Sequence, residues 1–443
     1  MTNLGTISNH LKREVSNAPL VLFRIAFGVL MTASVIRFML NGWVEEFYLK
    51  PTFHFTYYGF EWVQPLPEWA MYGLFGTMLI SSVLIAIGAF YRLSISLFFL
   101  TFTYVELIDK TYYLNHYYFV SLMAFILIWL PAARRFSVDA MRKPNSRVNS
   151  CQFYEIAIIR LQVGIVYFFA GVAKLNSDWL FKAMPLKIWL PANSHLPVIG
   201  SLLTKTWVAY FFSWFGALYD LTVPFFLSMK RTRWVAYLSV ISFHLLTAFL
   251  FPIGVFPYVM ILSAIIFFPS ELQEKWLQKL ERWMSISPSF NGSGSYLNNW
   301  KFGVFTAFIL LQLAMPWRYL MYPGSLFWHE QGYRFSWRVM LMEKMGQATF
   351  VVQDGGQKVI VDNRKHLTPL QEKMMATQPD MILQYAHYLE GVYELQGFNN
   401  PQVATEAYVT LNGRRSKQFI DEQVDLTEIE DSWKHKSWVL SYE

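Results

Sequence analysis

The chain has 443 residues, of which 54% are hydrophobic and 15% are charged, whereas a soluble globular protein carries about 25% charged residues. So little polar surface excludes a soluble multidomain protein and indicates a chain that lies largely in lipid. The net charge of +7 does not indicate nucleic-acid binding, because excess Lys and Arg in a membrane protein usually marks cytoplasmic loops.

The N-terminal residues 1–20 lack the short apolar core and small-residue cleavage site of a removable signal peptide, so the first apolar stretch is expected to remain as a span. A bilayer core of about 30 Å needs roughly 20 apolar residues as helix. Three of the nine candidate stretches, the third, fourth and eighth, are short and are expected to be tilted or re-entrant. The nine stretches are 19–40, 69–90, 93–108, 117–131, 153–172, 207–228, 234–251, 255–268 and 300–320.

Basic residues indicate which loops are cytoplasmic. The segment 132–147 and the loop 230–233 are rich in Arg and Lys, whereas the loop after the first span carries more acids. With nine spans, these loops place the N-terminus in the cytoplasm and the residues after 320 outside. The compact chain with a single cysteine suggests a bacterial inner membrane. We therefore expect a transmembrane domain at 1–321 and an extracytoplasmic domain at 322–443.

The C-terminal part has the pattern of a folded α+β domain rich in β-structure. The runs ATFVVQ and QKVIVD flank residues 354–356, and a second pair of runs flanks residues 412–413, which predicts two β-hairpins. Thr368 and Pro369 are typical of the N-cap and first position of a helix, expected here to continue to about Gln396. The predicted fold is thus a polytopic α-helical membrane protein with a C-terminal α+β domain.

Ionisable residues inside spans are costly and by default mark sites, relays or transport pathways. Arg160 in the fifth span and Asp220 in the sixth are expected to form a structural ion pair that serves packing. The same pair supports an alternative hypothesis, a non-enzymatic transporter. The single Cys151 excludes an internal disulfide and a cysteine-clustered metal site, and we expect no metal. Other ionisable residues in or near spans are Arg24, Arg37, Glu106, Asp109 and His244.

Lys174 and His116 lie at the outer ends of the fifth and fourth predicted spans. A lysine at a helix end commonly snorkels to the interface, and a histidine is ordinary in an aromatic interfacial belt. The functional alternative is a Lys174 amine kept neutral by a dry, aromatic surrounding, so that it can act as a base. The small residues 170, 171 and 173 would allow another helix or a flat ligand to approach Lys174 closely.

Several segments across nearly the whole chain resemble the vitamin K-dependent γ-glutamyl carboxylases, whose membrane part is called the horizontally transferred transmembrane domain. The membrane segments are LIDKTYYLNHYYF at 107–119, YFFAGVAKLNSDW at 167–179, LYDLTVPFFL at 218–227, FHLLTAFLFPIGVFPYVM at 243–260 and FFPSE at 267–271. The outer domain contributes GYRFSW at 332–337 and ILQYAHYL at 382–389.

This resemblance implies a lyase reaction in a membrane enzyme. A lysine base deprotonates vitamin K hydroquinone, dioxygen adds, and the oxygenated quinone becomes a base strong enough to take a γ-proton from a peptide glutamate. Carbon dioxide captures the carbanion, which leaves γ-carboxyglutamate and vitamin K epoxide. The implied partners are a glutamate-containing protein or peptide, the lipid bilayer and a quinone, and the implied cosubstrates are vitamin K hydroquinone, dioxygen and carbon dioxide.

The resemblance also implies roles for particular residues. Lys174 matches the catalytic lysine, His116 matches a histidine near the quinone, and His244 matches a second histidine counted here with substrate binding. Tyr333, Ser336 and Trp337 fall in the stretch associated with glutamate binding.

The chain also departs from the animal enzymes of this family. Met342 stands at or near the position of a histidine of the animal form, and the outer domain is shorter. These departures leave open an alternative hypothesis, a quinol oxidase or epoxidase without peptide carboxylation.

Overall fold

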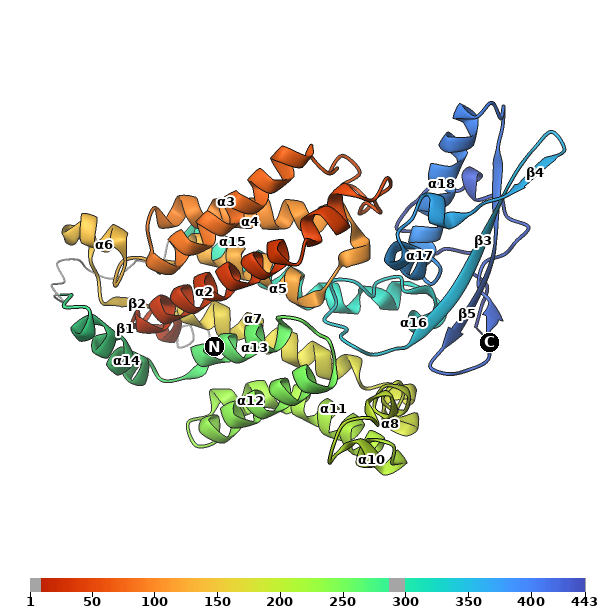
Figure 1. The fold of residues 1–443 in the computed structure, drawn as a ribbon. Helices are drawn as coiled ribbons and strands as arrows, with labels where there is room; N and C mark the ends of the chain where they lie inside the picture. The colour runs from red at the N-terminus through yellow and green to blue at the C-terminus, as the bar shows by residue number, and fades with distance from the viewer. Residues whose placement is uncertain (1–8, 287–298, 443) are drawn as a thin grey trace.

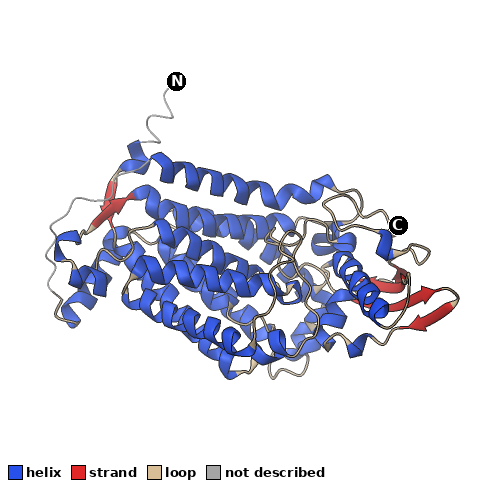
Figure 2. Cartoon of the chain, turned by 90° about the horizontal axis from the view of Figure 1, so that it is seen from above, coloured by secondary structure: helices blue, strands red, loops and turns tan. Residues whose placement is uncertain are grey.

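The structure, a computed structural model, describes residues 9–286 and 299–442. A bundle of long helices carries a β-sheet domain at one end, and a two-stranded ribbon lies at the opposite end (Figures 1 and 2). The bundle helices are α2 (Ala18–Leu40), α3 (Glu68–Ile87), α4 (Tyr91–Ile108), α5 (Asn115–Trp129), α7 (Phe153–Ala173), α11 (Thr206–Ser228), α12 (Arg233–Leu250), α13 (Phe256–Ala264) and α15 (Asn299–Ala314).

Shorter helices connect these elements. They are α6 (Val138–Arg142), α8 (Ser177–Lys182), α9 (Leu186–Trp189), α10 (Gly200–Leu203), α14 (Ser270–Trp283), α16 (Leu326–His329) and the 3₁₀ turns η2 (Lys110–Tyr112), η5 (Ile265–Phe267) and η6 (Met315–Met321).

All nine predicted spans are largely helical, but the count of nine is not confirmed. Within the described residues, six helices are long and apolar enough to cross a membrane, or seven if the bent pair around residues 256–283 is one span. The helix α5 has only 15 residues, and α13 continues into η5 before the chain bends by 109° into α14. The helix α11 has 23 residues, so its aromatic and polar composition, rather than its length, keeps it outside the six.

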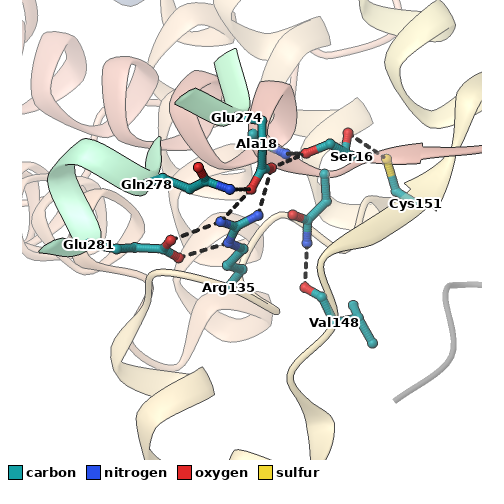
Figure 3. Close-up of polar contacts among 9 residues, drawn as sticks. Ser16, Ala18, Arg135, Val148, Cys151, Glu274, Gln278 and Glu281 are labelled. Carbon is teal, nitrogen blue, oxygen red and sulfur yellow. Dashed lines mark hydrogen bonds and ion pairs between the residues drawn. The ribbon is translucent and has the colours of Figure 1, made fainter. Parts of the chain in front are cut away.

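The end of the bundle opposite the sheet domain is held by an ion-pair cluster that the sequence did not indicate. Strand β1 (Glu14–Ser16) pairs with β2 (Ser150–Gln152). Beside them, the Arg135 guanidinium donates to Glu274 at 2.7 Å and 2.8 Å and to Glu281 at 2.7 Å and 2.8 Å, and Ser16 also donates to Glu274 (Figure 3). Arg135 thereby fastens α14 to the segment that follows α5.

The outer domain is a four-stranded antiparallel sheet in the order β4-β3-β5-β6, with α17 and α18 packed against it. Both predicted hairpins are present. The Thr368 side chain caps α17 in a capping box, as the sequence indicated. The single helix predicted up to Gln396 is wrong, because Pro379 drives Gln378 into extended backbone and splits the helix in two. The elements are β3 (Lys344–Asp354), β4 (Gln357–Ile360), α17 (Pro369–Met375), α18 (Pro379–Leu395), β5 (Gln402–Leu411) and β6 (Lys417–Gln418).

Buried polar contacts fix the outer domain on the bundle. Asp380 in α18 pairs with Lys110 at 2.9 Å and with Arg334 at 2.7 Å, and Gln371 donates to Asp109 at 2.9 Å. Burial alone would raise the pKa of Asp380, but Arg334 and Lys110 outweigh it and hold that pKa well below its usual range. Because the pKa of Asp380 is lower in the folded protein, its ion pairs stabilise the fold fully at pH values above the unfolded pKa of about 4. This stabilisation is lost as the pH falls toward the folded pKa.

We expect Arg135→Ala to lower the midpoint of thermal unfolding in detergent by about 3 °C or more, because it leaves Glu281 buried without its partner. The matched control is Arg134→Ala, which removes an exposed neighbour of the same charge. Equal midpoints for the two variants would show that the cluster does not stabilise this end of the bundle.

Candidate functional site

Lys174 follows the last helical residue of α7 and points into the bundle. Its side chain is 8% exposed, and its Nζ lies 2.6 Å from Asp220 Oδ2 and 3.3 Å from the carbonyl oxygen of Ala170. Nζ also lies 5.4 Å from the centre of the Trp179 ring. The side chain therefore does not reach out to the membrane interface as a snorkelling lysine does.

The predicted ion pair between Arg160 and Asp220 is wrong. Arg160 donates to the carbonyl oxygens of Ile266 at 2.8 Å and Phe268 at 3.1 Å, while Asp220 pairs with Lys174. Arg160 precedes Lys174 by 14 residues, which is about 21 Å along a helix axis, so it lies at a different depth from Asp220. The observation that motivated a transporter is thus removed.

Two features of the sequence shape α7 and α11 at this point. A Cβ on Gly171 would lie 2.7 Å from the backbone nitrogen of Leu221, so only glycine permits the observed approach of the helices. Pro224 in α11 has no N–H to donate to the carbonyl of Asp220, which weakens the helix at the turn that carries the carboxylate. Gly171, one of the small residues predicted to allow a close approach, therefore allows α11 to approach α7.

A cavity of about 100 Å³ surrounds the Lys174 and Asp220 pair, and its other walls are almost entirely apolar. His244 of α12 and Tyr167 of α7 also line it, and the Tyr167 hydroxyl lies 2.8 Å from His244 Nε2. The other ring nitrogen, Nδ1, has no hydrogen-bond partner within the described part of the chain. Tyr167 precedes Lys174 by seven residues, and this two-turn spacing is the signal that could have placed both on one helix face.

His116 lines a second, larger cavity of about 510 Å³. The two cavities share a wall made by Ile253, Phe256, Val339 and Met340. The Phe256 ring lies between the histidines, with centroid distances of 5.7 Å to His116 and 5.5 Å to His244. Lys174 and His244 thus line one cavity and His116 lines the adjoining one, so the three residues do not surround a single cavity.

The three residues expected to bind glutamate, Tyr333, Ser336 and Trp337, line neither cavity. Ser336 donates to the carbonyl oxygen of Gly332 at 2.7 Å, and Trp337 is 1% exposed and stacks on Tyr118. Their role in substrate binding stays a prediction. Their chain neighbours Val339 and Met340, which the sequence did not single out, do reach the cavity walls.

A cleft of about 1160 Å³ opens between the bundle and the outer domain. Val172 and Ala173, the residues just before Lys174, line it, as does Arg338. Asp178 in the same cleft accepts hydrogen bonds from Asn412 at 2.9 Å and from Arg414 of the outer domain. The cleft therefore provides a polar approach to the end of α7 that carries the buried lysine.

Comparisons with known protein families cover almost the entire chain. Residues 12–272 match the family model described as the HTTM domain. Residues 297–443 match the family model described as the vitamin K-dependent gamma-carboxylase lumenal domain. No solved structure gives a significant match.

The buried pair predicts a coupled stability effect. We expect Lys174→Met and Asp220→Leu each to lower the free energy of unfolding, because each leaves an unpaired group in an apolar cavity. The double variant should lose less than the sum of the two, by on the order of 1–3 kcal/mol. Thermal unfolding in detergent measures this cycle, and additive losses would mean that the two residues do not interact.

Proposed function

The chain belongs to the vitamin K-dependent gamma-carboxylase family, and on that basis we propose that it is an active vitamin K-dependent γ-glutamyl carboxylase. It oxidises vitamin K hydroquinone with dioxygen to the epoxide and couples this oxidation to the γ-carboxylation of peptide glutamate with carbon dioxide. The observation that carries the proposal is the buried pair of Lys174 with Asp220 inside an apolar cavity.

In this proposal the base is the pair rather than Lys174 alone. Nζ and Oδ2 are 2.6 Å apart, so one proton lies between them, and the pair is electrically neutral whichever atom holds that proton. When the pair takes the hydroxyl proton of the hydroquinone, the product is an ammonium on Lys174, a protonated Asp220 and a quinol anion. The positive charge left on Lys174 then stabilises the anion beside it.

Asp220 removes the need for a neutral Lys174 amine, which the sequence-based hypothesis required. An ammonium on Lys174 cannot accept a further proton, whereas a carboxylate can. Because Asp220 can hold the second proton, the pair accepts one proton without requiring a free amine beforehand. Asp220 is thus proposed as a catalytic residue, in place of the structural role expected for it.

The walls of the cavity suit a reaction that water must not enter. When bound, vitamin K hydroquinone supplies on oxidation a base strong enough to remove the γ-proton of glutamate. Phe243, Phe256 and Trp189 are among the apolar residues that exclude water from Lys174. His244 is held by Tyr167 and can offer its Nδ1 to a ligand oxygen. We propose that His116 contributes a hydrogen bond from the adjoining cavity.

The cavity volumes indicate where the quinol would lie. A space of about 100 Å³ is smaller than the roughly 300 Å³ at the lower end of ligand pockets, whereas the adjoining 510 Å³ is within their range. The quinol would therefore occupy the His116 cavity and reach Lys174 past the shared wall. Phe256 and Met340 are the side chains in that wall whose rotation would join the two spaces.

Quinol oxidation without peptide carboxylation is a second candidate. Met342 packs against the hydrophobic core of the outer domain, so the position associated with a histidine in the animal enzymes carries an apolar packing residue here. This difference concerns the peptide half of the reaction and leaves the Lys174 cavity unchanged.

We expect purified protein in detergent to incorporate labelled carbon dioxide into a glutamate-rich peptide and to consume oxygen when given vitamin K hydroquinone. Lys174→Ala and Asp220→Asn should each lower both rates by about 100-fold or more, because each removes part of the base. Lys205→Ala, which changes an exposed lysine before α11, should retain the wild-type rates.

The two measured rates separate the candidates. Labelling by the wild-type protein that does not exceed that of Lys174→Ala would refute the carboxylase. Oxygen uptake that depends on the quinol and on Lys174, but occurs without labelling, would establish the oxidase instead. Absence of quinol turnover in every sample would contradict both.

A further inference from the structure

Arg338 is a buried cation that has no acidic partner among residues 9–286 and 299–442. The residue is 7% exposed, and no ion pair among the described residues includes it. Its Nε is buried and has no hydrogen-bond partner in the described part of the chain. The guanidinium carbon lies 4.4 Å from the centre of the Tyr319 ring. An unpaired charge in such a position is costly, which calls for a physical explanation.

Several other buried cations among the described residues are paired with an acid. Lys174 has Asp220, Lys110 has Asp380, Lys344 has Glu330 and Arg135 has two glutamates. Two others donate to backbone carbonyl oxygens instead, Arg24 at 2.6 Å and 3.3 Å and Arg233 at 2.8 Å and 3.0 Å. Arg338 differs because its guanidinium faces an aromatic ring and an open cleft.

The position of Arg338 connects the spaces of the site. Its backbone carbonyl accepts a hydrogen bond from Asn115 at 2.8 Å, and both residues line the His116 cavity. Tyr319, under the guanidinium, lines the cleft, so the charged end of Arg338 lies at the cleft. The next two residues, Val339 and Met340, form the wall of the Lys174 cavity. Arg338 thus lies where the cleft adjoins the Lys174 and His116 cavities.

The backbone around Arg338 is held in an unusual conformation. Phe335, Trp337 and Met340 have φ angles of 60°, 58° and 52°, in the left-handed region that residues with a side chain rarely adopt. Such strain persists only where surrounding contacts impose it, and it clusters at binding sites. The stacked Trp337 and the bond from Asn115 supply those contacts here. The guanidinium is consequently presented on a fixed segment.

The described residues that line the cleft also carry an excess of positive charge. Asp178 is paired with both Lys182 and Arg414, so one negative charge faces two positive ones. Lys417, also in the cleft, donates to the carbonyl oxygen of Tyr442 rather than to an acid. A concave surface with this charge attracts an acidic peptide and directs it toward the buried guanidinium.

We propose that Arg338 binds the side-chain carboxylate of the substrate glutamate. This inference rests on the proposed carboxylase function and names the residue that holds its peptide substrate. A guanidinium binds a carboxylate through two parallel hydrogen bonds. Removal of the γ-proton places a second negative charge next to that carboxylate, and Arg338 would stabilise it.

Peptide binding tests the proposal without requiring turnover. A short fluorescein-labelled glutamate peptide is titrated with wild-type protein in detergent, and its glutamine counterpart serves as the ligand control. We expect Arg338→Gln to weaken binding of the glutamate peptide about 10- to 100-fold, as loss of a charged hydrogen bond does. Arg338→Lys should bind with intermediate affinity, because it keeps the positive charge but loses the paired, planar N–H donors of the guanidinium.

Arg415→Gln is the matched control. Arg415 is exposed on the turn before β6 and does not line the cleft, so this substitution removes the same charge outside the cleft. It should bind the peptide like the wild type. Near-ultraviolet circular dichroism and the midpoint of unfolding establish that the Arg338 variants are folded. Equal affinities of folded Arg338→Gln and the wild type, or equal affinities of the two peptides for the wild type, would overturn the proposal.

Kinetics distinguish this inference from the proposed function itself. In an active preparation, Arg338→Gln should raise the KM for the peptide about 10-fold or more, a larger factor than for the quinol, whose cavity Arg338 also lines. An unchanged peptide KM would refute the role of Arg338 and leave the carboxylase standing. Absence of any turnover by the wild type would refute the carboxylase, while the binding measurement would still decide whether Arg338 holds a carboxylate.

Discussion

The site depends on the requirement that a charge surrounded by apolar side chains be neutralised within the protein. Lys174 meets this requirement through Asp220 at 2.6 Å, and a side chain in lipid or in a dry cavity has few other options. Because the pair is neutral as a whole, it can persist in an apolar cavity and still exchange a proton. The close approach of α7 and α11 at Gly171 makes the pair possible.

The segment from Glu330 to Met340 links the outer domain to this buried pair. Its first residues contact the outer domain, where Glu330 pairs with Lys344, and its last residues form walls of the cavities in the bundle. Several residues along it have positive φ angles, which fixes the path of the chain where loops are usually adaptable. The proposed reaction joins a membrane-soluble quinol to a water-soluble peptide, and this segment connects the parts of the protein that would bind them.

Local patterns in the sequence predicted local structure well. Each predicted span is largely helical, Thr368 forms its capping box, and both hairpins are present. The errors came from long-range choices. Asp220 could pair with a basic residue at several depths of α7, and sequence spacing within each helix does not specify how two helices are aligned. The count of nine spans is not confirmed, since α5 has only 15 residues and α13 bends sharply into α14.

The sequence alone indicated a chain that lies largely in lipid and a C-terminal α+β part, and its resemblance to the carboxylases predicts catalytic roles for Lys174 and His116. These properties follow from composition, periodicity and contiguous motifs, which are encoded along the chain. The tertiary structure decided that Asp220 pairs with Lys174, that Phe256 lies between the two histidines, and that no acid among the described residues pairs with Arg338. Those facts depend on which side chains meet across packed helices, and that is settled by the packing of the whole bundle.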